Sequence, residues 1–304
     1  MGQINKIAQL KLWENCSVCC NFCYLNDRNI IGIEERRRRL IRSKDMISDL
    51  AKNYYRIGLI GGEFFTGELV GLENEWISLL SEISKYQFDQ VWIATSLLQK
   101  DLSLLTTSLE ILKYRHPIVC TSYDPEGRFH TVDEEERWKS NKTYLLNAGY
   151  EVNITVIPTK KVINGFKTGS LNFLRDCTSL SLSDPQLRYK FTLGCKRDSS
   201  YNHEFTANNN IFILPTRNEF LEFLSSEPEI LRNYARYEGV HSNTIIDFDR
   251  PYIQDHDRYD TSDPFYLDSR CGHPYIARWY PDSDQCAMCD AELLFQSMEL
   301  GSGY

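Results

Sequence analysis

The chain has 304 residues, of which 42% are hydrophobic and 25% charged, and its formal net charge is −8. Such a composition is typical of a globular protein with one large core, or with one domain of about 200 residues and a smaller one. The acidic charge argues against a nucleic-acid polymer as partner. Because no secretory signal and no apolar stretch of about 18 residues is evident, we expect a cytoplasmic protein that does not enter the membrane.

Runs of β-branched and aromatic residues alternate with helical patterns over the first two thirds of the chain. The clearest helical patterns cover 74–86 and 134–149, and the second ends at Gly149. This alternation predicts a parallel sheet with crossover helices, either an open doubly wound sheet or most of a barrel. The predicted strands are 7–13, 56–62, 90–97, 117–123, 151–158 and 187–193.

The alternation stops after about residue 200. Residues 202–216 are typical of a turn followed by a strand, and 217–239 of one or two helices. We therefore predict a core of residues 1–205 and a C-terminal extension of residues 206–304.

A basic run at 35–44, ERRRRLIRSK, is the most concentrated positive charge in the chain. We interpret it as a solvated helix face, and a phosphate or partner contact is the alternative.

The ten cysteines are clustered. Four lie at 16–23, three lie at 271–289, and single ones stand at 120, 177 and 195. In a reducing compartment, such clusters indicate metal or iron–sulfur ligands rather than disulfides. We expect Cys120 and Cys177 to be core residues.

The N-terminal cluster allows two ligand sets. All four thiols would suit zinc, but the adjacent Cys19 and Cys20 point in divergent directions. The other set is Cys16, Cys20 and Cys23, which would leave one iron of a four-iron cluster without a protein ligand and open to a small molecule.

The second set, with Phe22 before the last cysteine, resembles the signature of the radical S-adenosylmethionine (SAM) enzymes. Their second motif is also present, since Gly61, Gly62 and Glu63 follow the second predicted strand. The resemblance covers about residues 5–200 and implies a partial (β/α)6 TIM-like barrel. It further implies a [4Fe–4S] cluster on Cys16, Cys20 and Cys23, with Cys19 as a bystander.

Residues after other predicted strands extend the resemblance. It implies that Gly61, Gly62 and Glu63 hold the SAM ammonium group, and that Phe22 and Tyr24 cover the cluster. Further SAM contacts are implied at the ends of strands three, four and five. These candidates are Thr95, Ser96, Ser122, Asp124 and Asn153.

The resemblance also implies the chemistry. The reduced cluster would cleave SAM to methionine and a 5′-deoxyadenosyl radical, which abstracts hydrogen from a substrate. A flavodoxin-like or ferredoxin-like protein would supply the electron. The substrate would be a peptide or a nucleotide-derived metabolite. A zinc-binding interaction module and a cluster-binding scaffold without turnover are the alternatives.

The C-terminal cysteines form a second candidate metal site. Cys271, Cys286 and Cys289, with His273 or Cys195, would bind a structural zinc ion. Alternatively, these thiols would hold an auxiliary iron–sulfur cluster, in partial similarity to the SPASM and twitch extensions of some radical SAM enzymes.

Overall fold

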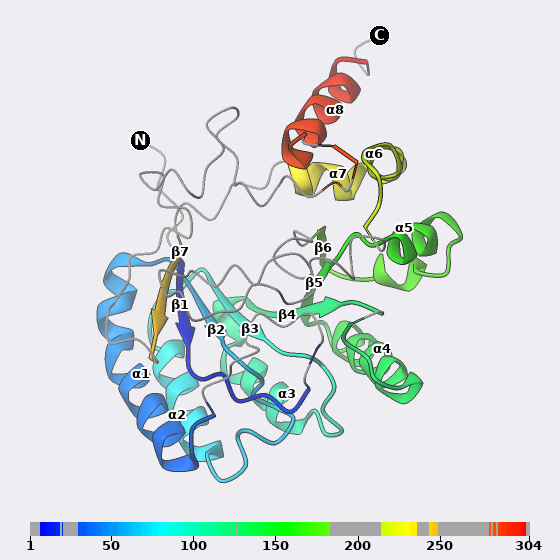
Figure 1. The fold of residues 1–304 in the computed structure, drawn as a ribbon. Coiled ribbons are helices and arrows are strands. Elements are labelled where there is room, and N and C mark those ends of the chain that lie inside the picture. Colours follow the sequence, from blue (N-terminus) through cyan, green and yellow to red (C-terminus); the bar gives the residue numbers. More distant parts are fainter. Residues whose placement is uncertain are drawn as a thin grey trace, which may run out of the picture.

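One sheet of parallel strands forms the centre of the protein, as Figure 1 shows. The computed structural model describes residues 7–18, 20, 30–125, 127–182, 214–235, 243–248, 280, 282–283 and 285–301. Within them the strand order is β6-β5-β4-β3-β2-β1-β7, and every pairing is parallel. The strands are β1 (Ile7–Lys11), β2 (Arg56–Ile60), β3 (Gln90–Ala94), β4 (Pro117–Tyr123), β5 (Glu151–Val156), β6 (Ser179–Leu182) and β7 (Asn243–Asp247).

The strand order distinguishes the two sheet types that the sequence left open. The first six strands lie in the sheet in the same order as in the chain. A doubly wound sheet would reverse its direction at a switch point, whereas a barrel winds in one direction. The predicted partial barrel is therefore confirmed.

Helices connect the successive strands and cover one face of the sheet (Figure 1). On that face Leu10, Leu59 and Ile93 are fully buried, in one apolar cluster with Leu40 and Leu79 of the helices. Such crossovers are the connection that parallel strands require. The helices are α1 (Ile33–Asn53), α2 (Glu73–Ser84), α3 (Ser103–Ile111), α4 (Val132–Asn147), α5 (Lys160–Lys167), α6 (Arg217–Ser226), α7 (Pro228–Ala235) and α8 (Ala287–Gly301).

Local sequence signals fix several helix ends. The Thr131 hydroxyl accepts a hydrogen bond from the Glu134 backbone N–H and caps α4, and Gly149, at φ +83°, follows its end. Thr216 and Glu219 form a capping box at the start of α6. The helix stop predicted at Gly149 is thus confirmed.

The opposite face of the sheet is more polar, and most of its residues are half buried. Residues that are paired in register share a face, because side chains alternate along each strand. One row across β3, β4, β5 and β6 consists of Ala94, Cys120, Asn153 and Ser179. The next row toward the carboxyl ends consists of Ser122, Thr155 and Ser181. This face therefore offers hydroxyl, amide and thiol groups to a ligand.

The observed elements differ from the predicted ones in the second half of the chain. The sixth strand of the sheet is Ser179–Leu182, whereas the predicted strand 187–193 lies outside the described residues. The strand β7 was not predicted, and it pairs with β1 although it comes from the predicted extension. Residues 217–239 contain two helices, α6 and α7.

The basic run 35–44 lies in α1, and part of it serves the fold. Arg38 is exposed, as expected of a solvated face, but Arg39 is buried and donates a hydrogen bond to the Leu12 carbonyl at 3.1 Å. Arg37 pairs with Glu75 of α2 at 2.7 Å. Among the described helices, none has the length and apolar character needed to cross a bilayer.

Candidate functional site

The N-terminal cysteines lie in the segment that follows β1. Cys16 and Cys20 are half buried against the apolar core, and neither is joined in a disulfide. Cys19, Phe22, Cys23 and Tyr24 lie outside the described residues. In the described part of the chain, no three metal-ligating side chains come together. The ligand set therefore stays a prediction, with two of its three cysteines, Cys16 and Cys20, among the described residues.

The Gly61–Gly62 pair touches the backbone of this cysteine segment. The Gly62 N–H donates to the Trp13 carbonyl at 2.7 Å. A Cβ atom on Gly61 would lie 2.3 Å from that carbonyl oxygen, and one on Gly62 would lie 1.9 Å from the Asn15 carbonyl oxygen. Gly61 also has φ +145°, which side chains disfavour. The glycines therefore let the end of β2 pack directly against the residues that precede Cys16.

The Glu63 carboxylate is enclosed by hydrogen-bond donors. Only 1% of the residue is exposed. One oxygen accepts from the Phe64 and Phe65 backbone N–H groups at 2.8 and 3.0 Å and from the Thr95 hydroxyl at 3.0 Å. The other accepts from the Ser96 N–H. In this arrangement Glu63 ties the end of β2 to the end of β3, and it also fixes two of the predicted SAM contacts, Thr95 and Ser96.

Ser122 and Asp124 lie at the end of β4, and both are buried. The Arg128 guanidinium donates to the Ser122 hydroxyl, and the Arg128 N–H donates to the Asp124 carbonyl at 3.1 Å. Arg128 was not predicted from the sequence, because the spacing alone gives no sign that it folds back onto Ser122. It adds a buried cation to this end of the sheet.

Asn153 lies on the polar face, in register between Cys120 and Ser179. Its side-chain oxygen is buried and has no hydrogen-bond partner among the described residues. A buried amide oxygen without a donor costs free energy, so this oxygen is a candidate acceptor for a ligand's hydrogen bond. Burial also raises the pKa of the neighbouring Cys120 thiol to about 12, so this thiol stays protonated at neutral pH.

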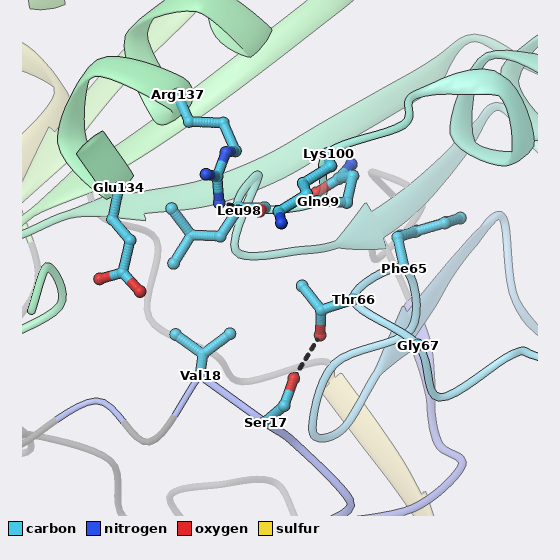
Figure 2. Close-up of a pocket in the computed structure, with 10 residues that line it drawn as sticks. All are labelled: Ser17, Val18, Phe65, Thr66, Gly67, Leu98, Gln99, Lys100, Glu134 and Arg137. Carbon is cyan, nitrogen blue, oxygen red and sulfur yellow. Dashed lines mark hydrogen bonds between the residues drawn. The ribbon is translucent and has the colours of Figure 1, made fainter. Parts of the chain in front are cut away.

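A cavity of about 420 Å³ lies beside the cysteine segment, as Figure 2 shows. The cysteine segment contributes Ser17 and Val18, and the Ser17 hydroxyl lies 2.8 Å from the Thr66 hydroxyl. Gln99 is 3% exposed, and both atoms of its amide lack a partner among the described residues. The other walls come from the loops after β2 and β3 and from α4. They consist of Phe65, Thr66, Gly67, Leu98, Lys100, Glu134 and Arg137.

The C-terminal candidate site is described in part. Cys286 is 3% exposed and directly precedes α8, and Cys289 lies in the first turn of that helix. In the same turn, Asp290 accepts two hydrogen bonds from Arg217 of α6, each at 2.7 Å. Cys195, Cys271 and His273 lie outside the described residues, so this ligand set also stays a prediction.

Comparison with known proteins shows the fold. No model of a known protein family matches the chain, and no curated protein matches its sequence. The structure of native anSMEcpe with bound AdoMet and Cp18Cys peptide is similar with a TM-score of 0.57 at 12% sequence identity. The structure of native anSMEcpe with bound AdoMet has a TM-score of 0.57 at 13% identity, and each comparison covers 97% of both chains. Both of these structures hold AdoMet, and the likeness confirms the fold that the sequence resemblance implies.

Proposed function

We propose that this protein is a radical SAM enzyme that binds a [4Fe–4S] cluster through Cys16, Cys20 and Cys23. The observation that carries the proposal is the contact between the two motifs. The segment leading to Cys16 packs on Gly61 and Gly62 at the carboxyl end of the sheet. Parallel barrels place their active sites at this end. The fold shared with AdoMet-bound enzymes supports the same conclusion.

The residues present fit an iron–sulfur cluster. Thiolates are the preferred protein ligands of such clusters, and Cys16 and Cys20 lie at the edge of the apolar core, where little water would reach a bound cluster. When bound, the reduced cluster supplies the electron that splits the sulfonium bond of SAM and so starts hydrogen abstraction from the substrate.

The polar face of the sheet fits SAM. The unpartnered oxygen of Asn153 would accept a hydrogen bond from the nucleoside, and Ser122 and Asp124 lie at the end of the neighbouring strand. The Arg128 guanidinium would attract the carboxylate of the methionine moiety. We assign Glu63 a supporting role, because its oxygens already accept four hydrogen bonds that shape the Thr95–Ser96 turn.

A peptide is the substrate that we favour over a nucleotide-derived metabolite. The support is the similar fold of anSMEcpe, which binds the Cp18Cys peptide. We further propose that an external flavodoxin-like or ferredoxin-like protein supplies the electron.

The C-terminal cysteines would hold a second cluster or a zinc ion. The start of α8 supports either, because Cys286 and Cys289 are three positions apart, the first buried and the second half buried. Such a site would brace the extension against the barrel without taking part in SAM cleavage.

Anaerobic reconstitution tests the proposal. About four irons per chain would indicate one cluster, and about eight would indicate two. With dithionite and SAM, we expect 5′-deoxyadenosine to be released. Cys20→Ala should abolish this release, whereas the matched Cys19→Ala variant should retain it. A colourless protein that contains zinc and leaves SAM intact would instead favour the interaction module.

A further inference from the structure

Asn15 joins the two ends of the cysteine segment. Its side-chain amide donates to the Ile31 carbonyl at 3.0 Å, and its side-chain oxygen accepts from the Ile31 N–H at 3.1 Å. One amide thus satisfies both main-chain groups of a residue sixteen positions away. The chain between them contains all the cysteines of the N-terminal cluster.

The main chain of Asn15 is fixed as well. Its carbonyl accepts from the Glu63 N–H at 2.9 Å, and Gly62 has no room for a side chain against that oxygen. Asn15 therefore connects three pieces of backbone. They are the start of the cysteine segment, its end at Ile31, and Glu63 after β2.

Hydrogen bonds also hold the backbone just after Cys16, at Ser17 and Val18. The Ser17 N–H donates to the Glu68 carboxylate at 3.0 Å, and the Val18 carbonyl lies 2.9 Å from His130 Nε2. Cys16 stands between Asn15 and these anchored positions. Its backbone is thus positioned by contacts of the protein itself.

Few side chains can replace Asn15. Aspartate of the same length can accept from the Ile31 N–H but cannot donate to its carbonyl, and alanine can do neither. The Asn15 amide offers one donor and one acceptor to the main chain of Ile31, as a residue on a neighbouring strand would. It is therefore suited to join the two ends of the loop.

We propose that Asn15 is a positioning residue that closes the base of loop 15–31 and places Cys16 before the cluster binds. The part of this inference that concerns the cluster rests on the proposed function. The part that concerns loop closure applies to the metal-free protein.

Asn15→Ala and Asn15→Asp test the inference, with Asn53→Ala as the control. Asn53 is exposed, and its side chain donates to the Asp49 carbonyl within its own helix. In metal-free protein, we expect hydrogen exchange of fragments covering Ile31 to be about tenfold faster in Asn15→Ala. Asn15→Asp should be intermediate, because it keeps one of the two hydrogen bonds. The control should match the wild type.

The second measurement is iron release from reconstituted protein to a ferrous chelator. We expect release to be about tenfold faster in Asn15→Ala than in the wild type, with a smaller increase in Asn15→Asp. The melting temperature of Asn15→Asp should fall by no more than about 3 °C. If exchange at Ile31 increases while iron release stays within about twofold of wild type, the positioning role is wrong.

The outcomes separate this inference from the proposed function. Wild-type exchange at Ile31 as fast as in an unfolded peptide would overturn loop closure, whatever the protein binds. A wild-type protein that binds no iron would overturn the proposed function and, with it, the positioning role, while the exchange result would still decide loop closure. If Asn15→Ala does not fold, Asn15→Asp decides, because unchanged exchange and unchanged iron release in that variant would contradict the inference.

Discussion

The two cysteine regions of this protein are anchored in different ways. The segment with Cys16 is held mainly through its backbone, which packs on Gly62 and Glu63 just after β2. The segment with Cys286 and Cys289 begins α8, and a side-chain ion pair between Arg217 and Asp290 ties that helix to α6. The first anchor tolerates almost no added atom, whereas the second depends on an ion pair between the partly exposed Arg217 and the buried Asp290. The comparison predicts that the N-terminal region responds to steric changes and the C-terminal region to changes of charge.

Gly62→Ala should have the largest effect. The added Cβ would lie 1.9 Å from the Asn15 carbonyl oxygen, so the cysteine segment must leave its place. We expect the free energy of unfolding, measured in urea, to fall by about 4 kcal/mol or more. Gly32→Ala is the control, because no other part of the described chain lies within 4 Å of its added Cβ. Equal stability of the two variants would contradict the backbone anchor.

Glu63→Gln should have the next largest effect. The glutamine oxygen can still accept from the Phe64 and Phe65 N–H groups and from Thr95. Its NH2 group would then face the Ser96 N–H, which now donates to the other carboxylate oxygen. We expect a loss of about 2–3 kcal/mol in the free energy of unfolding. Glu110→Gln, on the exposed surface of α3, should change it by less than about 0.5 kcal/mol. A loss of SAM binding without any loss of stability would instead show that the carboxylate contacts the ligand.

Asp290→Asn tests the second anchor. It removes the charge that pairs with Arg217 but keeps the shape of the side chain. Because Arg217 is partly exposed, we expect a loss of only about 1–2 kcal/mol, with faster hydrogen exchange confined to α8. Glu222→Gln breaks an exposed pair with Lys167 and serves as the control. Faster exchange in the cysteine loop as well would mean that the two regions are coupled.

The smallest effect concerns Cys120 and appears only at high pH. Its pKa of about 12 in the folded protein exceeds the ordinary value of 9.0, so the unfolded chain loses the proton first. Stability must therefore fall as pH rises above 9, with a slope of up to about 1.4 kcal/mol per pH unit from this group. In Cys120→Ala, the loss between pH 9 and 10 should be smaller by about 1 kcal/mol. Identical slopes would show that the thiol is not buried.

The sequence predicts the first half of the fold well because its strands are long enough to show their pattern. Five of the six predicted strands coincide with β1 to β5 to within a few residues. The strand β6 escapes prediction, since its four residues alternate serine and leucine and carry little β-branched or aromatic signal. The strand β7 was not predicted, because it pairs with β1, which lies more than 200 residues earlier in the chain.

The sequence indicates candidate residues for the site but not the contacts between them. The spacing of the cysteines and the position of Gly61–Gly62 identify the two motifs. Their direct contact depends on residues almost fifty positions apart, which no local pattern encodes. For the same reason, only the structure shows the two hydrogen bonds between Asn15 and Ile31 and the four hydrogen bonds that the Glu63 carboxylate accepts.

Electron paramagnetic resonance of the reconstituted, dithionite-reduced protein tests the central claim most directly, because it reports on the cluster and on what binds to it. The account predicts the signal of a reduced [4Fe–4S] cluster that changes shape when SAM is added, and the loss of this signal in Cys20→Ala. A signal that SAM leaves unchanged would mean that no iron is open to the cofactor. The absence of any cluster signal from fully reconstituted wild-type protein would contradict the account as a whole.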